Sequence, residues 1–103
     1  MNSEGREYDR RQMRRMLDVI ERYEHGQTGF VDLVDDLEAL ILALEHQSDE
    51  WRENALSQWG DLEQIRAVNL DRGTDINERQ ARDIHDALQE LKASVQEAMQ
   101  ADA

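Results

Sequence analysis

The sequence contains no cysteine and no proline, and each absence narrows what the protein can be. Without cysteine there is no disulfide framework, no thiolate chemistry and no cysteine-ligated metal. Without proline, no residue interrupts a helix by removing a backbone donor. The sequence also lacks a glycine-rich phosphate-binding loop and a serine in a nucleophile-elbow context. We therefore expect a protein that is not an enzyme.

Long apolar stretches are scarce as well. The longest nearly apolar stretch is Leu37–Leu44, and Glu38 interrupts it. It is far shorter than the roughly 20 residues that span a bilayer. The first fifteen residues are polar and do not resemble a secretory signal. These observations predict a cytoplasmic protein that does not enter membranes.

Positive charge is the third deficit. The chain has 24 acidic and 12 basic residues, for a net charge of −12, and residues 25–65 hold ten acids with Arg52 as their only base. Such a chain should repel nucleic acids and anionic membranes and attract a basic partner. We interpret the arginine cluster at 10–15 as solvated and paired with acids, rather than as a nucleic-acid patch. Solubility alone is the alternative explanation for the acidic surface.

Metal binding has little support in the pattern of potential ligands. His25, His46 and His85 do not fall in a recognisable ligand set. A calcium loop is suggested at residues 71–77, but Arg82 stands where its bidentate glutamate belongs. We therefore predict no metal and no cofactor.

Helical periodicity dominates what is present. Good helix formers such as Glu, Gln, Leu, Ala and Arg are abundant, and no strand-length alternation occurs. Apolar residues at spacings of three and four predict helices at about 9–24, 29–46, 49–72 and 78–99. The expected caps, in chain order, are Gly26, Thr28, Ser48, Gly73 and Asn77, the last forming a capping box with Gln80.

These segments predict an all-α fold, a compact antiparallel bundle of four helices that forms a single domain over residues 1–103. Short connections between long helices favour antiparallel neighbours. The second helix has the most apolar stripe, so we place it at the centre of the core. Gly60 indicates a kink or a split in the third helix. Residues 1–7 and 100–103 are expected to fray.

The candidate partner-binding residues are acids on the polar side of the second helix and its continuation, together with two tryptophans. Like charges at helical spacing are mildly destabilising, so the choice is between a solvated face and a docking face for a basic protein. Trp51 and Trp59 lie about 80° apart around a helix, and either core packing or interface anchoring accounts for them. The acids are Asp32, Asp35, Asp36, Glu38, Glu45, Asp49, Glu50 and Glu53.

Three stretches carry a resemblance to a known class of proteins. They read IERYEHG at 20–26, LVDDLEAL at 33–40 and EWRENALSQWGDLEQIRAVNLDRG at 50–73. This pattern resembles small acidic helical bacterial proteins, among them immunity proteins against toxins of contact-dependent growth inhibition or colicin type. The resemblance implies a cytoplasmic inhibitor that covers the active site of a cognate toxin domain, often a basic nuclease. It carries over no individual binding position.

The sequence therefore supports two alternative functions. The first is a toxin-neutralising immunity protein, or antitoxin, that occludes a basic toxin domain with carboxylates and apolar anchors. The second is a self-associating adaptor or regulatory protein, in which apolar faces pair between identical chains as a homodimer. A toxin-like C-terminus encoded by the adjacent upstream gene would favour the first.

Overall fold

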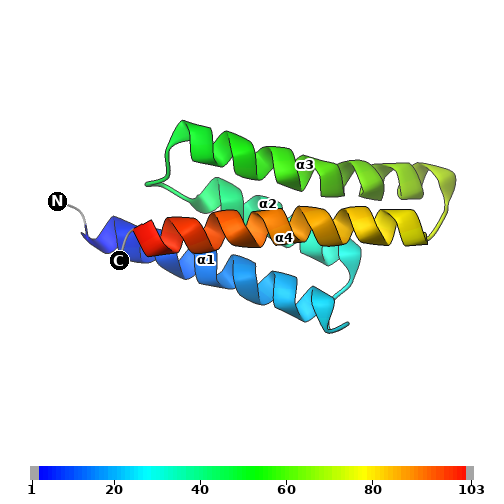
Figure 1. Cartoon of the computed structure of the whole chain (residues 1–103), viewed down its shortest axis with the longest axis horizontal. Coiled ribbons are helices and arrows are strands. Elements are labelled where there is room, and N and C mark those ends of the chain that lie inside the picture. Colours follow the sequence, from blue (N-terminus) through cyan, green and yellow to red (C-terminus); the bar gives the residue numbers. More distant parts are fainter. Residues whose placement is uncertain (1–2, 102–103) are drawn as a thin grey trace.

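Four helices make up nearly all of the structure, a computed structural model that describes residues 3–101, with side chains from Gly5 onward. They are α1 (Ser3–Glu24), α2 (Phe30–Ala43), α3 (Asp49–Arg72) and α4 (Glu78–Ala101). Successive helices run antiparallel and pack on one another, and α4 closes the bundle against α1 (Figure 1). No strand occurs among the described residues. The predicted all-α antiparallel four-helix bundle is confirmed.

The core draws on all four helices. The short helix α2 buries Leu33, Val34, Leu37 and Ile41 completely, but like each of the other helices it packs on only two neighbours, α1 and α3, among the described residues, so it is not more central than they are. Around it lie apolar residues of the other helices, which make one continuous cluster with those of α2. The cluster also contains Met13, Met16, Ile20, Leu44, Ala55, Leu62, Ile84, Ala87, Leu88, Leu91 and Val95.

Most predicted helix ends are confirmed by their hydrogen bonds. Ser48 Oγ accepts the amide of Trp51 at 3.1 Å and so begins α3. Gly73 ends α3 in a left-handed conformation with φ of 64°, which glycine adopts without strain. Asn77 Oδ1 accepts the Gln80 amide at 2.8 Å, and Gln80 Oε1 accepts the Asn77 amide at 3.1 Å, which completes the capping box of α4.

The first helix begins earlier than predicted. It starts at Ser3 rather than near Asp9, so the described part of the predicted frayed segment is helical. Within this longer helix, Asp9 makes a tertiary contact. Asp9 is 1% exposed and accepts the backbone amides of Glu45 and His46 at 2.9 and 2.8 Å. Residues 100–101 are helical as well, while residues 1–2 and 102–103 of the predicted tails lie outside the described residues.

The second helix is shorter than predicted at both ends. Gly29, not Thr28, precedes its first turn, and no side chain caps it. At the other end Leu44 leaves the helix with a ψ of 134°. This turn frees the amides of Glu45 and His46 to reach Asp9, so a distant carboxylate ends the helix where local periodicity would have continued it.

The third helix runs unbroken from Asp49 to Arg72, so the predicted split at Gly60 is wrong. On either side of Gly60, α3 packs against the core through Ala55 and Leu62, which are fully buried. With α4 it forms a long hairpin whose Gly73 turn extends past the shorter α2 (Figure 1).

Candidate functional site

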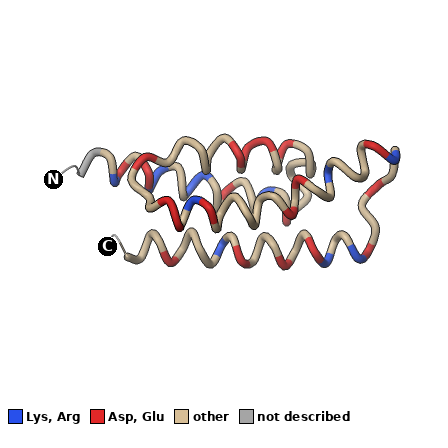
Figure 2. Tube along the Cα trace, turned by 90° about the horizontal axis from the view of Figure 1, so that it is seen from above, with Lys and Arg blue, Asp and Glu red and all other residues tan. Residues whose placement is uncertain are grey.

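The predicted acids all lie at or near the surface, in two groups on different elements. Asp32, Asp35 and Asp36 are exposed on α2, and Glu38 is half-buried there. The second group is exposed around the α2–α3 connection and the first turns of α3. Carboxylates are spread along most of the chain trace (Figure 2). The second group consists of Glu45, Asp49, Glu50 and Glu53.

The outer side of α2 carries more than acids. Val31, Asp35, Glu38 and Leu42 follow one another at spacings of four, three and four, so they form a line along the helix. We call this line the α2 stripe, and its length is about 16 Å at 1.5 Å per residue. Its ends are apolar yet open to solvent, since Val31 is 52% and Leu42 is 57% exposed. Two acids therefore lie between two exposed apolar groups.

The nearby cations neutralise little of this surface. α2 itself contains no lysine or arginine. Arg52, the only base in residues 25–65, donates to the carbonyl of Leu44 and so satisfies the end of α2. Arg66 donates to both carboxylate oxygens of Glu63 at 2.7 Å. The pKa of Arg66 is raised, chiefly by that hydrogen bond to Glu63 and further by the charges of Glu63, Asp35 and Glu38.

An apolar groove of about 680 Å³ continues the α2 stripe at its Val31 end. Phe30 and Val31 form one side, and Leu70 and Ile76 of the α3–α4 turn form the other. Leu70 is 76% and Ile76 is 37% exposed. Sequence reasoning did not place these two residues at a candidate site, because Leu70 lies off the periodic stripe of α3 and Ile76 lies between α3 and α4. Their exposure follows from the extension of the α3–α4 hairpin beyond α2.

Both tryptophans lie against the core and hold neighbouring helices. Trp51 Nε1 donates to the carbonyl of Ser94 on α4 at 3.2 Å, and Trp59 Nε1 donates to the carbonyl of Val34 on α2 at 2.8 Å. Their separation of about 80° around α3 explains why they contact different helices. Each remains partly exposed. Because each indole N–H is already bonded, any contact to a partner would use only the ring.

The arginine cluster of α1 is arranged differently from the prediction. Arg10 donates to the carbonyl of Met99 at 2.9 Å, next to the end of α4. Arg11, Arg14 and Arg15 are exposed. Within residues 5–101 the ion pairs are Asp18–Arg22, Glu63–Arg66 and Glu24–Lys92, so the cluster is not paired with acids there. Arg11, Arg14 and Arg15 are thus solvated, as predicted, whereas the predicted pairing with acids is wrong and Arg10 is held against the end of α4.

The described residues contain neither a metal-binding cluster nor a helix suited to cross a membrane. No group of three or more histidine or carboxylate side chains there could hold a metal ion. None of the helices over residues 3–101 combines the length and the apolar character that a membrane crossing requires. Comparison of the chain with protein-family models, with curated proteins and with solved structures finds no match. The resemblance to immunity proteins therefore stays a prediction.

Proposed function

We propose that the protein is an immunity-type inhibitor that binds a basic toxin domain, such as a nuclease, and covers its active site. The α2 stripe is the observation that supports this proposal most directly. Carboxylates take the place of the phosphates that a nuclease binds, and their field speeds association with a basic surface. The exposed apolar groups at both ends, Val31 and Leu42, supply contacts that lose water on binding and slow dissociation.

The self-associating alternative relies on the same apolar groups. Pairing two α2 stripes would bring Asp35 and Glu38 of one copy against the same acids of the other. Each chain also carries a net charge of −12, so the two copies repel at long range. Arg66 stands near enough to Asp35 and Glu38 to offset part of this charge. Charge complementarity therefore favours a basic partner over a second copy.

Two variants test separately whether the α2 acids speed association and whether the apolar groups slow dissociation. On this proposal the binding partner is a toxin-like C-terminal domain encoded by the adjacent upstream gene, expressed with its active site disabled. Asp32, Asp35, Asp36 and Glu38 are changed together to amides, because lysines at 35 and 38 would face Arg66. By surface plasmon resonance, the association rate should fall about tenfold at 50 mM salt and much less at 500 mM. Circular dichroism should stay unchanged, since none of the four side chains belongs to the core.

The anchoring part uses a second variant. Val31→Ala with Leu42→Ala should raise the dissociation rate with little change in association. Protection of cells from the active toxin should fall in both variants. Lys92→Gln on the opposite side of the bundle serves as the control. An association rate that is the same for the wild type and the amide variant at both salt concentrations would contradict the role of the α2 acids.

A further inference from the structure

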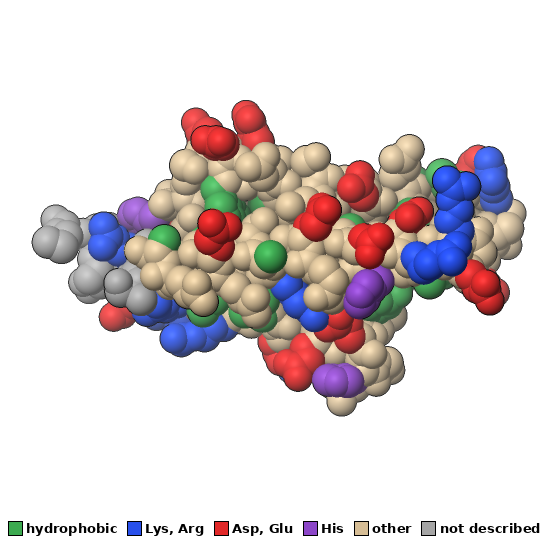
Figure 3. Space-filling view, viewed as in Figure 1, with side chains coloured by type: hydrophobic (Ala, Val, Ile, Leu, Met, Phe, Trp, Pro, Cys, Tyr) green, Lys and Arg blue, Asp and Glu red, His purple; other side chains and the backbone are tan. Residues whose placement is uncertain are grey.

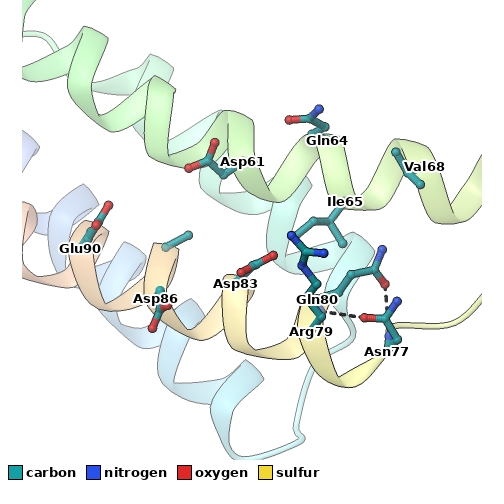
Figure 4. Close-up of a pocket in the computed structure, with 11 residues that line it drawn as sticks. Asp61, Gln64, Ile65, Val68, Asn77, Arg79, Gln80, Asp83, Asp86 and Glu90 are labelled. Carbon is teal, nitrogen blue, oxygen red and sulfur yellow. Dashed lines mark hydrogen bonds between the residues drawn. The ribbon is translucent and has the colours of Figure 1, made fainter.

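A second groove lies between α3 and α4, away from the α2 stripe. Its volume is about 530 Å³, and it is open along the outer face of the α3–α4 hairpin (Figure 4). Ile65 and Val68 of α3 and Ala87 of α4 give it apolar lining. No segment among residues 3–101 covers it, since α1 and α2 pack on the other side of the hairpin (Figure 1). The groove is therefore a face between two helices with no partner within the described chain.

Carboxylates flank this apolar lining on both sides. Asp83, Asp86 and Glu90 follow one another on α4 at spacings of three and four, and Asp61 faces them from α3 (Figure 4). All four are exposed. The only cation that lines the groove is Arg79, near the α3–α4 turn. The space-filling view shows carboxylates distributed over this same face of the molecule (Figure 3).

The turn at one end of the groove is held rigidly. Asn69 and Gln80 exchange two amide hydrogen bonds, at 3.1 and 3.0 Å, and so join α3 to α4. Gln80 also takes part in the capping box with Asn77. The two helices that form the groove are therefore fixed relative to each other at this end, and binding would not have to order them.

We propose that this groove holds a basic amphipathic helix of the partner protein. The lining from Asn77 to Glu90 spans 13 residue steps, or about 20 Å, which matches a segment of about 14 residues. Apolar side chains one turn apart would cover Ile65, Val68 and Ala87. Lysine or arginine on both flanks of that apolar strip would meet Asp61 on one side and the α4 acids on the other. This is the helix-in-groove mode of recognition with complementary charge.

The negative charge of the groove disfavours other molecules that could occupy it. Nucleic acid and anionic membranes share the sign of the groove, and a second copy would present the same acids in its own groove. The inference rests on the proposed function, from which it takes the positive charge of the partner. It adds that the partner binds through a helix and that this helix lies in the α3–α4 groove. Its test uses a synthetic peptide, so its outcome does not depend on the toxin.

The probe is a 14-residue amphipathic peptide with leucines one turn apart and lysines on both flanks, blocked at both ends. It is titrated into the full-length ¹⁵N-labelled protein. Amide shifts should concentrate between residues 61 and 68 and between 79 and 90. Asp83→Asn with Asp86→Asn should weaken binding about tenfold by calorimetry, whereas Asp32→Asn with Asp36→Asn, which removes equal charge from α2, should change it less than about threefold.

Other outcomes overturn the inference. Equal losses in the two double variants would mean that net charge alone attracts the peptide. Equal affinity for a peptide of the same composition with scrambled order would remove the requirement for an amphipathic helix. If the protein alone sediments in a concentration-dependent way and shows amide shifts at the groove, the groove binds a second copy of the chain. If the peptide binds as expected but the wild-type protein neither binds the toxin domain nor protects cells, the proposed function fails and the groove assignment stands.

Discussion

Asp9 shows how one side chain joins two distant parts of the chain. It is buried, and its two carboxylate oxygens accept the amides of Glu45 and His46. The same contact holds α1 to the bundle and sets the point at which α2 stops. A neutral side chain without acceptors would leave both amides without their partner, and α1 would lose its attachment to the α2–α3 connection.

We therefore expect Asp9→Ala to lower the free energy of unfolding by about 2–3 kcal/mol, since hydrogen bonds to a charged acceptor are the stronger kind. Asp9→Asn keeps one acceptor oxygen and should cost less. Asp18→Ala, which removes an exposed ion pair with Arg22 on the same helix, should change stability by less than about 1 kcal/mol. Urea unfolding measures all three. Equal midpoints for Asp9→Ala and Asp18→Ala would contradict this role.

Two glycines, one within α3 and one at its C-terminal cap, should respond in opposite directions to the same substitution. Gly60 lies within the helix, and a Cβ there would meet no atom within 4 Å. Gly60→Ala should therefore stabilise the protein by about 0.5–1 kcal/mol. Gly73 also has open space but adopts a φ of 64°, so Gly73→Ala should destabilise by about 1–2 kcal/mol. Thermal melts of both variants provide the check, and a loss of stability in Gly60→Ala would show that the glycine is needed.

At the scale of the helix, α2 is stabilised by its buried side more than by its ends. Its N-terminus has no side-chain cap, and its exposed side carries acids without an intrahelical base. Leu37→Ala should cost about 2–5 kcal/mol, because the side chain is fully buried and its removal leaves a cavity. Leu40 is only partly buried, so Leu40→Ala should cost clearly less. Similar shifts in the urea midpoints of the two variants would mean that α2 packs differently.

The helices could be predicted from local sequence because their signals are local. Apolar spacing and the caps at Ser48, Gly73 and Asn77 act within a few residues, and the structure confirms them. The end of α2 could not be predicted in this way, because it depends on Asp9, which lies 36 residues from Glu45.

The candidate site was predictable only in part. Charge composition located the acids of α2, but not the exposed apolar residues at the ends of the α2 stripe. Leu42 lies off the apolar stripe of α2 despite its apolar neighbours in sequence, and it is 57% exposed because the α2 face it occupies has no covering helix. The α3–α4 groove brings Asp61 opposite Asp83, residues that no local pattern connects.

Across the whole molecule, charge is distributed unevenly around the bundle. The first 24 residues are neutral, and residues 25–65 hold ten acids and one base. That single base, Arg52, binds the carbonyl of Leu44 rather than a carboxylate. Much of the acidic charge is therefore uncompensated on the side of α2 and α3. Such a distribution favours association with a cationic surface at the cost of self-repulsion in the folded state.

That self-repulsion leads to a prediction about salt. At a net charge of −12, the folded chain should gain stability as sodium chloride rises from 10 mM to 1 M, because the screening length shrinks from about 30 to 3 Å. Asp36→Asn with Glu53→Gln removes two exposed acids from the crowded region, so it should be more stable than the wild type at low salt and gain less from added salt. Asp32 is left in place, since an acid in the first turn of α2 favours the helix dipole. The measurement is the urea midpoint of the wild type and of the double variant at both salt concentrations. Parallel salt responses in the two proteins would show that the acids do not limit stability, and would leave partner binding as their remaining proposed role.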